Sequence, residues 1–84
     1  MNYYILDYIT SDNYLEKRVK YRKEHLNHAT EYFNEGYLIL GGAIDAATEA
    51  VLVFNADSEK IPEAFAQNDP YVKNGLIKSW SVKK

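Results

Sequence analysis

The chain contains no cysteine, only two prolines and four glycines, and no long apolar run. Without cysteine, the fold cannot rest on disulfides or on a cysteine-built zinc site. No apolar segment approaches the roughly 18–20 residues that span a bilayer, and the start, Met1-Asn2-Tyr3-Tyr4, lacks the basic residues of a signal peptide. The sequence therefore predicts a cytoplasmic protein with no membrane contact.

An excess of positive charge is also missing. Ten Lys and Arg residues against twelve Asp and Glu residues give a net charge of −2, and the isoelectric point is about 5.6. This balance disfavours a general nucleic-acid binder. The sequence has no phosphate-binding glycine-rich loop and no Gly-x-Ser-x-Gly elbow, so neither nucleotide binding nor serine-based hydrolysis is indicated.

Tyrosine is abundant in a chain of ordinary overall composition. The 84 residues are 46% hydrophobic and 26% charged, which predicts one soluble globular domain over residues 1–84. Eight of the residues are Tyr. So much amphipathic aromatic area suits a lined pocket or a dimer interface, although strands also favour Tyr.

Hydrophobic periodicity divides the chain into alternating elements. The predicted strands are Tyr3–Ile9, Tyr37–Leu40, Ala50–Phe54 and Leu76–Val82, and the predicted helices run from about Tyr14 to Glu35 and from about Asn55 to Gln67. Capping of the long helix is expected from residues 11–13, its end at Gly36, a hairpin at residues 45–48, and the end of the second helix at residues 68–70.

The order β-α-β-β-α-β predicts an α+β, ferredoxin-like fold with a four-stranded antiparallel sheet. Both helices then lie on one face of the sheet. The last strand, which carries Lys78 on its apolar side, suits an edge position. The other face of the central strands exposes Ile, Val and Tyr, and such a patch usually marks an interface. We therefore predict a homodimer packed sheet against sheet.

The long helix carries an apolar stripe that is expected to face the core. Its members follow the 3.6-residue period: Leu15, Val19, Leu26, Ala29 and Phe33. Arg22 falls within this stripe, and a charge there needs a partner or a wet cleft. Arg22 either snorkels past the core to pair with a carboxylate or binds an anion in a cleft.

Four further polar residues are candidates for chemistry. His25 lies at the expected core boundary and is either structural or a proton-transfer group, while His28 is expected to point further towards solvent. The pair resembles half a metal site, but no third ligand is signalled, so we expect no metal. Asp69 before Pro70 is either a helix-ending turn or a site residue. Asp7 either faces a polar pocket or accepts a hydrogen bond from Arg18, Arg22 or a Tyr hydroxyl.

Several short motifs together resemble the YciI-like (YCII-related) family over almost the whole chain. These motifs are Tyr3-Tyr4, Leu15-Glu16-Lys17-Arg18, Arg22-x-x-His25-Leu26, Gly36-x-Leu38, Gly41-Gly42, Ser58, and Asp69-Pro70-Tyr71-Val72 with Gly75. The chain departs from the family pattern at Ala43, where members commonly carry Pro, and in its short hairpin at residues 45–49. The rim of the pocket is therefore expected to differ.

The resemblance implies a fold of the dimeric α/β barrel type, similar to muconolactone isomerase. It implies a site centred on His25 and Asp69. We expect catalytic roles for these two residues and substrate-binding roles for Arg22, Tyr71 and Gly42. Family members with an assigned activity include dehydrochlorinases that act on hydroxylated aromatics. No metal or other cofactor is implied.

Three functions follow as alternatives. In the first, the protein is a cofactor-independent lyase, dehydrochlorinase or isomerase in which His25 moves a proton and Asp69 orients it. Its substrate is then a small hydroxylated aromatic or anionic molecule, with Arg22 near an anionic oxygen. In the second, the pocket binds a small ligand without reaction. In the third, the chain is a dimerisation module.

Overall fold

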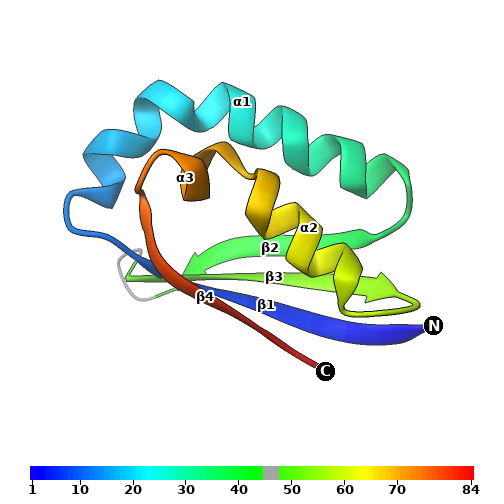
Figure 1. Cartoon of the computed structure of the whole chain (residues 1–84). Helices are drawn as coiled ribbons and strands as arrows, with labels where there is room; N and C mark the ends of the chain where they lie inside the picture. Colours follow the sequence, from blue (N-terminus) through cyan, green and yellow to red (C-terminus); the bar gives the residue numbers. More distant parts are fainter. Residues whose placement is uncertain (45–47) are drawn as a thin grey trace.

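One four-stranded sheet with helices on a single face makes up the fold in the computed structural model, which describes residues 1–44 and 48–84 (Figure 1). The elements in chain order are β1 (Asn2–Thr10), α1 (Tyr14–Asn34), β2 (Leu38–Ile44), β3 (Glu49–Ala56), α2 (Lys60–Asn68), α3 (Pro70–Lys73) and β4 (Ile77–Lys83). The strand order is β2-β3-β1-β4, and all pairs are antiparallel. The ferredoxin-like fold is confirmed, and β4 is an edge strand as expected.

The central strand β1 separates the core from the opposite sheet face. Tyr4, Leu6 and Tyr8 point towards the helices and are buried, as the period of two predicts. On the other face, Tyr3 is 65% exposed and Ile5 is 43% exposed. The core therefore lies between the sheet and the helices, and the helix-free face of the sheet exposes large apolar side chains of β1.

The buried face of α1 is not the expected one. Leu15, Val19, Leu26 and Phe33 are 49%, 75%, 47% and 59% exposed. Of the predicted stripe, only Ala29 packs against the core. The residues that turn inwards carry rings: Tyr14, Tyr21, His25, His28 and Tyr32.

The error is one of phase and has a physical cause. The ring-bearing stripe has the same helical spacing as the aliphatic stripe and starts one residue earlier, and one residue turns an α-helix by about 100°. Tyrosine and histidine rings bury a large apolar area when their polar tips find partners. Four of these rings make ring–ring contacts inside the fold, for example Tyr32 with Phe54 and Phe65. The rings therefore take the inner face.

Several element bounds also differ from the prediction. β2 continues through Gly41 and Gly42 to Ile44, because these glycines pair with β3 in a regular ladder. β3 extends through Asn55 and Ala56, so α2 begins only at Lys60. The short helix α3 was not predicted. Of the expected hairpin at 45–48, residues 45–47 lie outside the described residues.

The two ends of α1 differ in how well the sequence predicts them. Asn13 occupies the N-cap position with φ 63° and makes no side-chain capping bond, while Ser11 Oγ donates to the Leu76 carbonyl 2.9 Å away. The expected side-chain cap is therefore absent from residues 11–13. Gly36, with φ 85°, ends the helix as expected, because that backbone conformation favours glycine.

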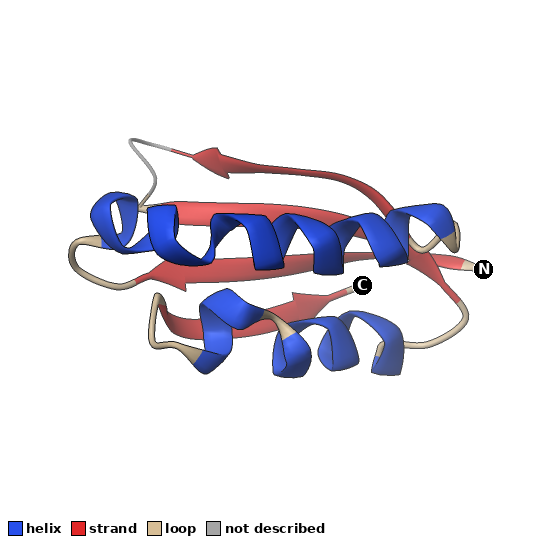
Figure 2. Cartoon of the chain, turned by 90° about the horizontal axis from the view of Figure 1, so that it is seen from above, coloured by secondary structure: helices blue, strands red, loops and turns tan. Residues whose placement is uncertain are grey.

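The helices cover the sheet unevenly. Viewed from above, α1 and the α2–α3 segment lie side by side, and β2 lies beyond the edge of α1 (Figure 2). No helix in the described part of the chain is both long enough and apolar enough to cross a membrane.

Candidate functional site

A pocket of about 290 Å³ lies between α1 and strands β2 and β3. One wall is polar and aromatic and includes Tyr8, Arg18, Arg22, His25 and Tyr71. The remaining lining is small or apolar and includes Leu26 of α1 and the glycines of β2. A pocket of this size, at the lower end of the range for small-molecule sites, suits a molecule of about one ring.

Asp69 is placed in the core by the local sequence Asp-Pro-Tyr. Pro70 cannot continue α2 but fits the first turn of α3, and Asp69 becomes the N-cap of that helix. Its Oδ1 accepts the Tyr71 backbone N–H at 3.0 Å. The Asp69 side chain has no solvent exposure. Asp69 therefore ends α2, and the same residue also places a buried carboxylate in the core.

His25 reaches this carboxylate from the neighbouring helix. Its Nδ1 lies 2.7 Å from Asp69 Oδ1, and its side chain is 16% exposed. An ionised carboxylate only accepts hydrogen bonds, so a neutral His25 that bonds to it carries its proton on Nδ1. The second ring nitrogen, Nε2, makes no hydrogen bond to any residue in 1–44 or 48–84, which leaves a lone pair at a ring that lines the pocket.

Tyr8 holds the other oxygen of Asp69. Its hydroxyl donates to Oδ2 at 2.7 Å, and the tyrosine is buried. Burial, followed by the nearby charge of Asp69, raises the pKa of the Tyr8 phenol well above its ordinary value of 10.0. Tyr8 therefore stays protonated and remains a hydrogen-bond donor at physiological pH.

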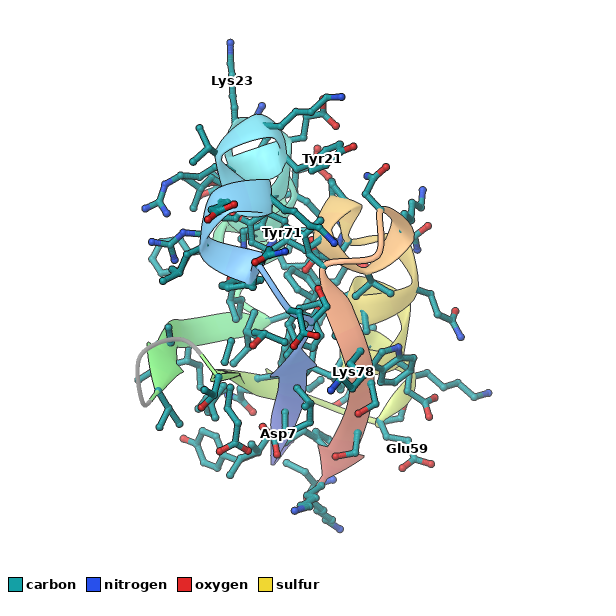
Figure 3. All side chains as sticks on the ribbon, turned by 90° about the vertical axis from the view of Figure 1, so that its left-hand side faces the viewer. Asp7, Tyr21, Lys23, Glu59, Tyr71 and Lys78 are labelled. Carbon is teal, nitrogen blue, oxygen red and sulfur yellow. The ribbon has the colours of Figure 1, made fainter. Side chains whose placement is uncertain are left out.

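Tyr71 fixes the plane of the imidazole. Its ring is stacked on that of His25, with the centroids 3.9 Å apart and the planes 3° apart, and its edge meets Tyr14 at 5.8 Å. Figure 3 shows Tyr71 lying between α1 and the rest of the fold. Burial raises the pKa of Tyr71, and the Arg22 and Arg18 guanidiniums partly offset this rise. The stacked ring leaves the imidazole little freedom to turn.

Two guanidinium groups border the same pocket. Arg22 is exposed and Arg18 is half-buried, with its guanidinium carbon 5.7 Å from the centre of the Tyr14 ring. The one ion pair in the described residues joins His25 and Asp69, so neither arginine has a carboxylate partner there. Arg22 thus does not snorkel from a buried stripe to a carboxylate, and both charges are available to a ligand.

Gly42 lines the pocket together with Gly41 and Ala43. A Cβ atom added to Gly41 would lie 3.3 Å from a Leu52 side-chain carbon, whereas one added to Gly42 would meet nothing within 4 Å. Close packing therefore restricts a side chain at Gly41, whereas the space at Gly42 would admit one.

Two other candidates lie away from the pocket. His28 is half-buried rather than directed to solvent, and its Nε2 lies 2.9 Å from the Phe65 carbonyl. Asp7 lies on the helix-free face of the sheet (Figure 3), so it accepts no bond from Arg18 or Arg22. No group of three His, Cys, Asp or Glu side chains in the described ranges is arranged to hold a metal ion.

All five residues expected at the site gather around the pocket or its wall: His25, Asp69, Arg22, Tyr71 and Gly42. The sequence reasoning missed Tyr8, and it considered Arg18 only as a possible hydrogen-bond donor to Asp7. The signal for Tyr8 was its place in the period-of-two pattern with Tyr4 and Leu6, which predicts a buried hydroxyl that needs a hydrogen-bond partner.

This combination of topology and site defines an α+β protein of the ferredoxin-like class. The profile of the YCII-related domain family matches residues 1–84. The chain belongs to this family. None of the functionally curated proteins matches the chain in sequence.

Solved structures share the fold at low sequence identity. The 5-chloro-2-hydroxyhydroquinone dehydrochlorinase of Burkholderia phenoliruptrix AC1100 is 21% identical, with a TM-score of 0.81 over 99% of this chain and 92% of that one. An uncharacterised NIPSNAP domain protein of Burkholderia xenovorans is 16% identical, with a TM-score of 0.59 over 99% and 90%. A NIPSNAP family protein of Agrobacterium tumefaciens is 14% identical, with a TM-score of 0.60 over 96% and 87%.

Proposed function

We propose that the protein catalyses proton transfer on a small anionic molecule, with His25 as the base and Asp69 as its partner. The observation that carries this proposal is the 2.7 Å contact between His25 Nδ1 and Asp69 Oδ1, which leaves Nε2 unpaired at the pocket among the described residues. An imidazole suits this role because its unperturbed pKa is about 6.5.

Asp69 has two tasks in this reaction. It holds the proton of neutral His25 on Nδ1, so that Nε2 can accept a proton from a substrate carbon or hydroxyl. It also stabilises the imidazolium that forms, because the buried carboxylate lies against the charged ring. The proton can then return from Nε2 to another atom of the same substrate, which gives isomerisation. In elimination, the electron pair of the broken C–H or O–H bond becomes part of a new π bond while the leaving group departs with its bonding electrons, and Nε2 then passes the proton to the leaving group or to water.

Arg22 and Arg18 favour an anionic substrate. Two guanidinium groups that border the pocket and lack carboxylate partners in the described part of the chain present a positive field beside the base. A carboxylate or ring oxyanion placed there gains charge-assisted hydrogen bonds. Negative charge that develops on the substrate after proton removal is stabilised by the same groups.

The solved relative from B. phenoliruptrix supports the reaction class. That protein is a dehydrochlorinase of a hydroxylated ring, and its structure holds 2,5-dihydroxybenzoquinone. A one-ring, oxygen-rich ligand also suits the size of the pocket in this chain. We therefore place the substrate among small aromatic or cyclic molecules that carry an acidic group.

Ligand binding can be tested before any substrate is known. Benzoate should raise the melting temperature of the purified protein, and benzamide, with the same ring and no charge, should raise it much less. Arg22→Met should remove most of the benzoate effect. Lys23→Met is the matched control, since Lys23 is the next residue, is exposed and does not line the pocket. Equal stabilisation by benzoate and benzamide would contradict the anion site.

Proton transfer can be tested without knowledge of the net reaction. Small hydroxylated aromatic acids and keto acids are incubated with the protein in D₂O, and exchange at carbon is followed by NMR. We expect exchange with at least one of them, and its loss in His25→Ala. Exchange that survives in His25→Ala would contradict the assigned base.

We also propose a homodimer packed through the helix-free sheet face. Four large apolar side chains on this face are exposed, namely Tyr3, Ile5, Leu40 and Ile44. These side chains come from β1 and β2, and β3 pairs with both strands between them. Contiguous apolar surface of this kind usually meets a partner.

Two matched substitutions test this assembly. Ile5→Glu places a second acid beside Asp7 on the sheet face and should give a monomer in sedimentation experiments. Val19→Glu changes an exposed apolar residue of α1 and should leave the dimer intact. A wild-type monomer at micromolar concentration, or a dimer unaffected by Ile5→Glu, would exclude the sheet face as the interface.

A further inference from the structure

Asp69 receives three hydrogen bonds, but they are divided unequally between its two oxygens. Oδ1 accepts from both His25 Nδ1 and the Tyr71 backbone N–H. Oδ2 accepts from Tyr8 alone in the described residues, at 2.7 Å. Because Asp69 is fully buried, water cannot replace a lost donor at Oδ2 without a change in the local packing.

Tyr8 approaches from a rigid part of the molecule. It lies in the central strand β1, paired with Ala50 of β3 and Trp80 of β4. Its side chain is 1% exposed. The strand therefore presents the hydroxyl at a fixed point, whereas Asp69 lies between two helices and His25 is on a third.

We infer that Tyr8 is a positioning residue of the proton-transfer pair: its buried hydroxyl fixes the Asp69 carboxylate, and the carboxylate then holds His25 with its proton on Nδ1. This role rests on the function proposed above. Tyr8 does not transfer the proton itself, since its hydroxyl is engaged with Asp69.

Loss of the hydroxyl has a specific chemical consequence. In Tyr8→Phe, Oδ2 becomes a buried acceptor without a donor, and that arrangement is costly. The carboxylate relieves the cost by turning Oδ2 towards another donor or by binding a proton. Either change weakens the acceptor at His25 Nδ1, so part of the His25 population moves its proton to Nε2. In that tautomer Nε2 cannot act as a base.

The test is the tautomer of His25 in ligand-free Tyr8→Phe, read from the ¹⁵N chemical shifts of the ring at a pH where the ring is neutral. We expect the ratio of the Nδ1–H form to the Nε2–H form to fall at least severalfold from its wild-type value. In the D₂O exchange assay, kcat should fall about tenfold with KM within twofold, which matches the loss of one hydrogen bond to a charged group.

Tyr4→Phe is the matched control. Tyr4 lies on the same strand and the same buried face, and its hydroxyl makes no bond to Asp69. Tyr4→Phe should keep the wild-type tautomer ratio and kcat. A loss of packing at β1 alone would affect both variants in the same way, whereas a positioning role affects only Tyr8→Phe.

Two results would overturn the inference. One is a wild-type tautomer ratio in Tyr8→Phe under conditions in which Asp69→Asn changes the ratio. The other, which applies even if Tyr8→Phe does not fold, is the absence of a slowly exchanging Tyr8 hydroxyl proton in NMR spectra of the wild-type protein. The tautomer is measured without substrate, so the two hypotheses can fail separately. The tautomer ratio can stay unchanged in Tyr8→Phe while His25 is still essential for exchange. Conversely, the ratio can change in Tyr8→Phe while His25→Ala still supports exchange.

Discussion

His25 and His28 lie one turn apart on the same helix, yet they make different contacts. His25 bonds through Nδ1 to the carboxylate of Asp69, the N-cap of α3, and its ring lines the pocket. His28 bonds through Nε2 to the Phe65 carbonyl, one of the last four carbonyls of α2, which lack an i+4 donor within that helix. One imidazole meets the start of a helix and the other meets the end of one.

The partner decides what each ring can do. A carbonyl accepts a hydrogen bond but gives no full charge, so His28 acts as a donor that satisfies the end of α2. Its ring also stacks on Phe65, with centroids 4.5 Å apart. A buried carboxylate both orients the ring and stabilises its protonated form, so His25 is equipped for proton transfer. In the proposed function, the group that each histidine bonds to therefore determines its role.

The largest expected effect separates the two rings by activity. His25→Ala should lower proton exchange or turnover by roughly 10²–10⁴, the usual contribution of a positioned base. His28→Ala should leave the rate of the folded protein within a few fold, because His28 does not line the pocket. Initial rates, normalised to folded protein, make the comparison. Equal losses in the two variants would mean that the difference in partner has no chemical consequence.

A smaller effect is expected from the partner of His25. Asp69→Asn keeps an N-cap side chain for α3, since Asn and Asp cap helices about equally well. It removes the charge that stabilises the imidazolium and the acceptor that fixes the tautomer, so the rate should fall roughly 10²-fold. A rate close to that of the wild type, measured under the same conditions, would leave Asp69 with a structural role only.

The smallest effect concerns the stability of the fold, for which His28 is expected to matter more than His25. His28→Ala leaves the Phe65 carbonyl without its side-chain donor and removes a ring stacked on Phe65. We expect the free energy of unfolding to fall by about 1–3 kcal/mol. Urea denaturation with an unchanged m-value gives this number. No loss of stability would show that the end of α2 needs no donor from α1.

Much of this contrast could be read from the sequence, and part of it could not. The period of two in Tyr4-Ile5-Leu6 and the end of α2 before Pro70 follow from local rules, and the structure has both. The meeting of His25 with Asp69 follows from the predicted side-by-side packing of the helices. The Asp69-Pro70 pair is also a local signal for the start of a helix, but it was interpreted only as the end of α2, so α3 was missed.

The phase of α1 was beyond the sequence pattern for a different reason. The aliphatic stripe through Leu15 and Val19 and the ring stripe through Tyr14 and His25 have equal periods, so periodicity cannot choose between them. The choice depends on partners in other elements, such as Phe65 and Asp69, that satisfy the polar tips of the rings. His28 was expected to face solvent because its partner, the Phe65 carbonyl, lies in another helix. Tyr8 was overlooked because its partner, Asp69, is likewise distant in sequence.

The ring nitrogens of the two histidines give the most direct test of the central claim. In ¹⁵N NMR spectra of the ligand-free wild-type protein at a pH where both rings are neutral, the contacts predict opposite tautomers: a proton on Nδ1 in His25 and on Nε2 in His28. A proton on Nε2 in both rings would contradict the account, because His25 would then have no free lone pair at the pocket and could not act as its base.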